Sequence, residues 1–259
     1  MSDIQVSWPE RGVALVTLDR PSRRNALNLA AWRGLAEQFR ALAGERGVRL
    51  IILTGAGGHF CAGADISEFA EVRADSASGA AYEREVAACY AAIRAAPQPT
   101  IAAIDGACVG GGCAIALCCD FRVMHRAARF GIPATRLGTI YTVAECGFLY
   151  SIVGLANAKR ILYSSDLFDI VAAREMGFAD VVAKGGAVDA AIEFGERIMA
   201  NAPLALAGTK LILEALAAGD VAARRGEIDS LVKQALDSED YREGARAFLE
   251  KRPARFTGR

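Results

Sequence analysis

The sequence predicts an α/β fold followed by a purely helical C-terminal region. Through roughly residue 186, short β-rich runs alternate with segments whose apolar residues recur at helical spacing. Such alternation is typical of mainly parallel sheets covered by helices. From Ala187 onward only helical patterns remain. We therefore predict two regions, residues 1–186 and residues 187–259.

The elements of the first region follow from their strand runs and turn residues. Residues 4–8 and 13–18 are β-rich, and Gly12 makes the turn between them. Asn28 can cap a helix, and Gly47 is expected to end it. A buried strand is predicted over residues 48–53, and further strands over residues 100–104 and 121–124.

The second region is predicted from helical stripes and a cap. Apolar residues from Ile228 to Leu236 lie on one face of a helix. Ser238 can begin a last helix that ends near Pro253. Between the two regions no low-complexity linker occurs, and the Ala-, Ser- and Gly-rich segment 73–81 is predicted to be the most mobile.

Composition excludes several classes of protein. Of 259 residues, 53% are hydrophobic and 23% charged, which excludes a disordered chain. Equal numbers of basic and acidic residues, 30 each, argue against broad electrostatic binding to nucleic acid or an anionic membrane. No apolar run reaches the 18 or so residues of a membrane span, and the N-terminus lacks signal-peptide features, so we expect a cytoplasmic protein.

The seven cysteines are expected to be reduced and buried. They lie inside apolar segments, form no CxxC pair and are accompanied by only two histidines, His59 and His125. We therefore predict no metal site.

Two glycine-rich segments, residues 55–66 and 105–114, each join a strand to a helix. Free N–H groups at a helix start point toward whatever negative oxygen lies there. Neither segment carries the lysine of a phosphate-binding P-loop or the GxGxxG dinucleotide fingerprint. Two such loops together can give two N–H donors to one oxygen, which is an oxyanion hole. The alternative is that both are turns packed closely on a sheet.

The order and spacing of several motifs resemble the enoyl-CoA hydratase/isomerase, or crotonase, superfamily over nearly the whole chain. The motifs are Arg20-Pro21 with Asn25-Ala26-Leu27, Phe60-Cys61-Ala62-Gly63-Ala64-Asp65, Gly110-Gly111-Gly112-Cys113, Phe130-Gly131-Ile132-Pro133, Leu137-Gly138, Arg174 to Gly177 with Ala179-Asp180-Val181-Val182, and Phe248 to Arg252. The resemblance implies a crotonase-like spiral of ββα turns in residues 1–186. It also implies a helical trimerisation region in residues 187–259, in a homotrimer or a dimer of trimers.

The resemblance also implies an acyl-CoA ligand, with no cofactor beyond the CoA moiety of the substrate. The N–H groups of Ala64 and Gly111 would hold the thioester oxygen. The residues around Ala64 would meet the adenine and pantetheine end of CoA. Three basic residues are weaker candidates to bind the CoA phosphates, and the alternative is that they are free surface charges. These predicted CoA contacts are Ala62, Gly63, Asp65 and Ile66 in the loop, and Arg23, Arg24 and, from a neighbouring chain, Lys251.

The sequence departs from the family where hydratases carry two catalytic glutamates, because those positions are Ala114 and Ala134 here. General acid–base groups are worth about 10²–10⁴-fold each, so ordinary hydration should be slow. Decarboxylation needs no strong base, because the departing CO₂ leaves its electrons in the enolate. Tyr141 resembles the tyrosine that methylmalonyl-CoA decarboxylases place near the departing carboxylate, although those enzymes have histidine where this chain has Ala64.

Glu145 is the other candidate acid or base. Some isomerases of the superfamily keep a single glutamate just beyond this loop, although their position corresponds more nearly to Thr142. Thr142 and Glu145 also form the pattern of a capping box, in which the glutamate only satisfies the helix start.

Three functions therefore remain open at this point. The first is an acyl-CoA lyase of decarboxylase type, with Ala64, Gly111 and Tyr141 at its centre. The second is a hydratase or isomerase that uses Glu145 as a relocated base. The third is a non-catalytic acyl-CoA-binding protein. The lyase is favoured, because enolate stabilisation survives the loss of both glutamates.

Overall fold

The computed structural model describes residues 3–72 and 74–259. The chain separates into two compact units, Met1–Ala96 with Thr100–Ile192, and Pro97–Pro99 with Glu193–Arg259. The predicted boundary at residue 187 falls at the start of a helix whose first turns belong to the first unit. Ala187 and Ala191 are fully buried, and the Ala187 N–H donates to Asp105 at 3.4 Å.

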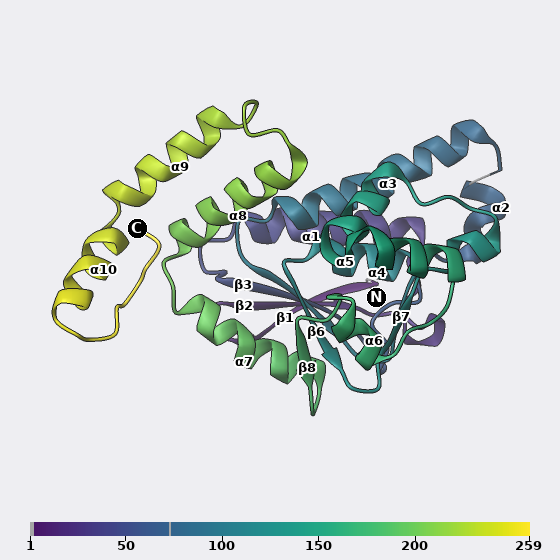
Figure 1. The fold of residues 1–259 in the computed structure, drawn as a ribbon, viewed down its shortest axis with the longest axis horizontal. Coiled ribbons are helices and arrows are strands. Elements are labelled where there is room, and N and C mark those ends of the chain that lie inside the picture. The colour runs from purple at the N-terminus through teal and green to yellow at the C-terminus, as the bar shows by residue number, and fades with distance from the viewer. Residues whose placement is uncertain (1–2, 73) are drawn as a thin grey trace. The chain divides into compact units, whose positions relative to one another are not determined.

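The first unit is built on a six-stranded sheet in the order β1-β2-β3-β4-β6-β8 (Figure 1). The first two strands pair antiparallel, and every later pair in this sheet is parallel, as the strand–helix alternation predicted. The strands of the first unit are β1 (Ile4–Glu10), β2 (Val13–Leu18), β3 (Leu50–Gly55), β4 (Thr100–Ile104), β5 (Ala107–Val109), β6 (Phe121–His125), β7 (Arg129–Gly131) and β8 (Val181–Ala183).

The chain winds as a spiral in which successive turns give one strand to the large sheet and one to a smaller layer. After β4 and β6, the chain turns into β5 and β7, which pair parallel in a second sheet. Isolated bridges extend this layer: Cys61 pairs with Cys108, and Leu27 pairs with Ala64. The ββα spiral expected from the resemblance is therefore confirmed.

Helices cover the sheet of the first unit. Within it, α1, α3, α4 and α5 form a chain of packed neighbours on one side of the strands (Figure 1). The helices are η1 (Pro21–Arg23), α1 (Leu29–Ala43), η2 (Ile66–Glu68), α2 (Phe69–Val72), α3 (Ser76–Ala95), α4 (Gly111–Cys118), η3 (Pro133–Leu137), α5 (Val143–Ser164), α6 (Ile170–Glu175) and α7 (Ala187–Met199), the last shared with the second unit.

Local chemistry explains where these helices begin and end. The Asn28 side chain accepts from the Ala31 N–H at 2.7 Å, which confirms the predicted cap of α1. The predicted end at Gly47 is wrong, because α1 ends at Ala43 and Gly44 is its C-terminal cap. Residues 76–81 of the segment predicted to be mobile form the first turns of α3, started by Asp75 in a capping box; Arg73 lies outside the described residues.

The second unit contains helices α8 (Pro203–Ala218), α9 (Arg225–Asp237) and α10 (Glu239–Leu249). Ser238 accepts from the Tyr241 N–H at 3.0 Å, which confirms the predicted cap of α10. The helix ends at Leu249, before the predicted end near Pro253, and Glu250 is its C-terminal cap. Buried Asp240 holds the C-terminal tail by accepting from the Thr257 and Gly258 N–H groups.

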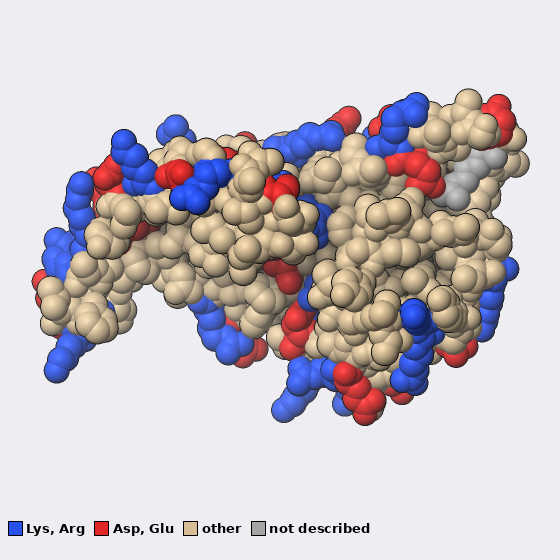
Figure 2. Space-filling view, turned by 45° about the horizontal axis from the view of Figure 1, so that its top comes forward, with Lys and Arg blue, Asp and Glu red and all other residues tan. Residues whose placement is uncertain are grey.

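The distribution of charged side chains and the state of the cysteines agree with what the composition predicts. On the face drawn in Figure 2, basic and acidic side chains are interspersed, so neither sign dominates it. Six cysteines are buried free thiols, whereas Cys146 is half-buried. Within the described residues, no group of three or more His, Cys, Asp or Glu side chains could hold a metal ion, and no helix is long and apolar enough to cross a bilayer.

Candidate active site

The spiral brings the two predicted glycine loops together. The bridge between Cys61 and Cys108 lays the segment after β3 along β5, and the Gly63 backbone is left-handed with φ of +100°. A β-carbon at Gly63 would lie 2.9 Å from the Val109 carbonyl oxygen and 3.3 Å from the Gly111 nitrogen. Only glycine fits this approach, so its place in the motif has a steric cause.

Two backbone N–H groups meet at this contact. A β-carbon at Gly111 would lie 3.4 Å from the Ala64 nitrogen. Gly111 is the first residue of α4, where an N–H has no partner in its own helix. Within the described part of the chain, neither N–H donates a hydrogen bond to another protein group. Ala64 and Gly111 also line one cavity, so their N–H groups are available to a ligand oxygen.

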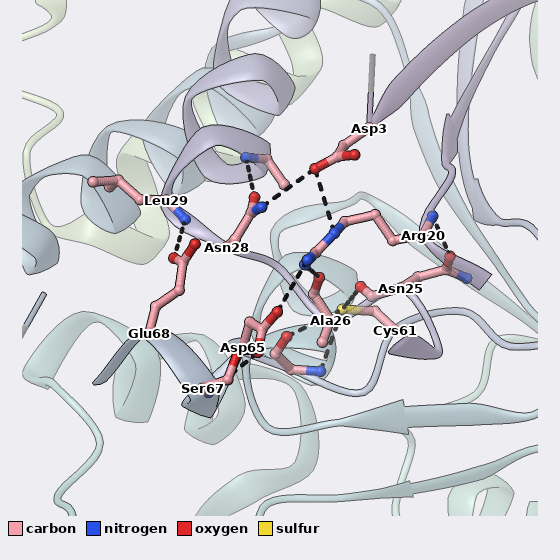
Figure 3. A network of polar contacts seen from close by, with 12 residues as sticks. Asp3, Arg20, Asn25, Ala26, Asn28, Leu29, Cys61, Asp65, Ser67 and Glu68 are labelled. Carbon is pink, nitrogen blue, oxygen red and sulfur yellow. Dashed lines mark hydrogen bonds and ion pairs between the residues drawn. The ribbon is translucent and has the colours of Figure 1, made fainter. Parts of the chain in front are cut away.

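Arg20 anchors the loop that carries Ala64. Its guanidinium bonds Asp65 at 3.0 Å and Asp3 at 3.3 Å, and it also donates to the Ala26 carbonyl. Figure 3 shows both carboxylates pointing toward the guanidinium. Hydrogen bonds from Ser67 and then from Arg20 hold the pKa of Asp65 below its usual value. Asp65 therefore acts as an anchor, a role the sequence reasoning missed when it placed this residue against CoA.

Some of the predicted CoA contacts line the cavity and others do not. Ala62, Gly63 and Ile66 line the cavity, and Ile66 is 61% exposed at its edge. Arg23 and Arg24 are exposed on and just after η1 and do not line it. Lys251 is an exposed residue of the second unit, and its contact with the CoA of a neighbouring chain stays a prediction. Three of the four predicted loop contacts thus lie at the cavity, whereas Asp65, Arg23 and Arg24 lie outside its lining.

The cavity has a volume of about 150 Å³ and one aromatic wall. Trp32 donates from its indole nitrogen to the Tyr82 hydroxyl at 2.9 Å, and its ring meets Tyr90 edge-on at 5.8 Å. Both tyrosines and Trp32 belong to the buried hydrophobic core, so their packing fixes the position of this wall beside the N–H pair.

Tyr141 lies on the carbonyl side of the Gly110–Gly111 peptide, opposite the Gly111 N–H. Its hydroxyl donates to the Gly110 carbonyl at 2.6 Å, and it lines the cavity with Glu145. Burial, and then the nearby Cys113 and Glu145, raise the pKa of Tyr141 well above its ordinary value, so the hydroxyl keeps its proton.

Glu145 is both a helix cap and a buried carboxylate in the cavity wall. Its Oε2 accepts from the Thr142 N–H and hydroxyl, each at 2.9 Å, which confirms the predicted capping box. Its Oε1 accepts from the Tyr90 hydroxyl at 2.8 Å. Because a carboxylate has about four acceptor positions, these three bonds leave one free on Oε1. No local pattern could have revealed Tyr90, which is 55 residues away.

The two positions that hold glutamates in hydratases are apolar here. Ala134 lines the cavity, and Ala114 is fully buried in α4. Among the described lining residues, the carboxylates are Glu83 and Glu145, and of these Glu145 is the buried one. The cavity therefore offers one fixed carboxylate beside two free N–H donors.

Other polar residues near the cavity have structural partners. The His59 ring accepts from the Ala107 N–H at 3.1 Å. Glu68 accepts from the Leu29 N–H at 2.9 Å and so caps the start of α1 (Figure 3). These bonds hold the spiral together.

Comparison with known proteins agrees with this architecture. The model of the enoyl-CoA hydratase/isomerase family matches residues 9–259. A 2,3-dehydroadipyl-CoA hydratase of Escherichia coli is 33% identical, and the match covers all of both chains. An enoyl-CoA isomerase/hydratase of Mycosarcoma maydis is 31% identical over 96% of this chain and 93% of its own. A crystal structure of an enoyl-CoA hydratase/carnithine racemase from Magnetospirillum magneticum superposes with a TM-score of 0.92 at 37% identity, over 100% of this chain and 97% of that one.

Proposed function

Because the chain belongs to the enoyl-CoA hydratase/isomerase family, we propose that it moves a proton on an acyl-CoA thioester through an enolate. The enolate oxygen would be held by the N–H groups of Ala64 and Gly111, and Glu145 would carry the proton. The observation that supports this most strongly is the pairing of one buried carboxylate with two free N–H donors in a single cavity.

The N–H pair accounts for the enolate. When a proton leaves the carbon next to a thioester, the negative charge moves to the carbonyl oxygen. Two fixed donors aimed at that oxygen stabilise it, and the loss of one donor typically costs about 10²–10³-fold in rate. Rigid surroundings make this effect larger, because the donors need not reorient during the reaction.

The presence of one buried carboxylate in the cavity favours double-bond isomerisation within the family. Hydration uses one group to activate water and another to protonate carbon, and both of those positions are alanine here. Isomerisation needs one base that removes a proton from one carbon and returns it to another. Glu145 has one acceptor position left on Oε1 for that proton. The relatives whose names include isomerase are consistent with this proposal.

A second candidate is the decarboxylase-type lyase. It is favoured by the absence of both hydratase glutamates, because Ala134 lines the cavity at one of those two positions. In that reaction the carbon–carboxylate bond breaks, its electron pair forms the enolate, and the N–H pair receives the charge. The Tyr141 hydroxyl proton is already given to Gly110, and the Glu145 carboxylate would repel a substrate carboxylate, so we rank the lyase second.

A substrate panel separates these reactions. Under one set of conditions, the protein would be given a 3-enoyl-CoA, crotonyl-CoA and methylmalonyl-CoA. We expect conversion of the 3-enoyl-CoA to its conjugated isomer to be fastest. Crotonyl-CoA hydration should be at least about 10³-fold slower than in an ordinary hydratase, because two acid–base groups are missing.

Each other outcome of the panel has a definite meaning. Release of CO₂ without isomerisation would establish the lyase in place of our first proposal. Rapid hydration would show that Glu145 alone replaces both missing glutamates. Binding of all three esters without turnover would leave the non-catalytic acyl-CoA-binding function.

We also propose that the second unit mediates self-assembly into a trimer or a pair of trimers. Its helices carry large apolar side chains that are exposed in the single chain, namely Leu213, Leu216, Val232, Leu236, Phe248 and Leu249. A soluble monomer rarely leaves so many apolar side chains uncovered on neighbouring helices. Sedimentation at micromolar concentration should therefore show an oligomer, and a monomer there would contradict the proposal.

A further inference from the structure

The Gly110–Gly111 peptide is held on its carbonyl side by two hydrogen bonds. The Gly110 carbonyl accepts from the Tyr141 hydroxyl at 2.6 Å and from the Ala114 N–H at 3.1 Å. A peptide is planar and trans, so its carbonyl and its N–H point in opposite directions. Whatever fixes the Gly110 carbonyl therefore also fixes the direction of the Gly111 N–H.

This peptide needs such an anchor. Gly110 has φ of 54° and ψ of −119°, which places it outside both helical and strand backbone. The residue precedes α4, so the helix holds its carbonyl through only the first hydrogen bond of the ladder. Regular secondary structure alone leaves the peptide plane weakly determined, and the phenol is the additional constraint.

We propose that Tyr141 is a positioning residue, which aims the Gly111 N–H at the thioester oxygen and strengthens it as a donor, without touching the reacting atoms. The inference rests on the proposed role of the Ala64 and Gly111 N–H groups. Hydrogen bonds in a chain polarise one another, so a donor on the carbonyl makes the N–H of the same peptide a stronger donor. The phenol thus stabilises the enolate indirectly.

The test uses a chromophoric thioester, 4-(dimethylamino)cinnamoyl-CoA, bound to the intact protein. Its absorption moves to longer wavelength when its carbonyl oxygen receives strong hydrogen bonds, because excitation shifts negative charge onto that oxygen. The red shift and the Kd would be measured for the parent chain and for Tyr141→Phe, which keeps the ring and removes only the hydroxyl. Thermal unfolding would establish that the variant is folded.

Two further tyrosine variants serve as controls. Tyr90→Phe removes a hydroxyl of the same cavity that faces Glu145 and not the Gly110 peptide, so its red shift should remain. Tyr163→Phe changes a residue that is 74% exposed, so both the red shift and the turnover should remain.

We expect Tyr141→Phe to lose at least about half of the red shift, with a Kd changed less than about threefold. With the acyl-CoA that turns over in the panel, kcat should fall about 10- to 100-fold while KM changes little, since a stronger donor acts mainly on the charged enolate. An unchanged red shift and kcat would overturn the inference, and so would loss of binding alone. If the parent chain fails to bind the probe or binds it with no red shift, the proposed oxyanion hole is itself wrong.

Discussion

Gly111→Ala is expected to lower kcat by about 10²–10³-fold, which is the typical cost of losing one oxyanion-hole donor. The new β-carbon would lie 3.4 Å from the Ala64 nitrogen and 3.1 Å from the Trp32 ring. It would therefore occupy the place where the thioester oxygen must sit between the two N–H groups. Turnover of the best substrate of the panel, with CD and thermal unfolding to verify the fold, measures the effect.

Gly226→Ala is the matched control for this change. Gly226 is an exposed residue of α9, and apart from its chain neighbours and the adjoining helix backbone no atom lies within 4 Å of the added β-carbon. The same chemical change should therefore leave turnover unaltered. A folded Gly111→Ala protein with full activity would show that no ligand oxygen lies between these two nitrogens.

Glu145→Gln should reduce isomerisation by about 10²–10⁴-fold and leave the fold intact. Glutamine serves in a capping box as well as glutamate does, because its amide oxygen can still accept from the Thr142 N–H. The variant therefore removes the base and keeps the cap. The ratio of kcat values, together with the free energies of unfolding, separates the two roles.

Glu145→Ala completes the comparison. It removes the cap as well, so it should cost about 1 kcal/mol of stability beyond the loss of activity. If Glu145→Gln keeps full isomerase activity, the residue is only a cap. If decarboxylation is the observed reaction and is unaffected by Glu145→Gln, the lyase is the correct function.

Local chemistry explains why much of the fold could be predicted from the sequence. Caps such as Asn28 and Ser238 act within three residues, and the sequence displays both partners. The predicted end of α1 is wrong because two glycines, Gly44 and Gly47, follow the helix and either could end it. The close approach of the glycine loops followed from their composition together with the family resemblance.

The anchors of the site could not be predicted in this way. Arg20 meets Asp65 across 45 residues, Tyr141 meets Gly110 across 31, and Tyr90 meets Glu145 across 55. No spacing rule links such partners, because the spiral alone brings them together. The family resemblance therefore places Tyr141 near a substrate carboxylate, whereas its hydroxyl donates to the Gly110 carbonyl.

The most direct test of the account is a crystal structure of the Glu145→Gln variant with the acyl-CoA substrate that it can bind but not convert. We expect the thioester oxygen within about 2.7–3.1 Å of both the Ala64 and Gly111 nitrogens. The glutamine side chain that replaces Glu145 should lie beside the carbon that loses its proton. A thioester oxygen bound elsewhere, with both N–H groups left free of it, would contradict the account.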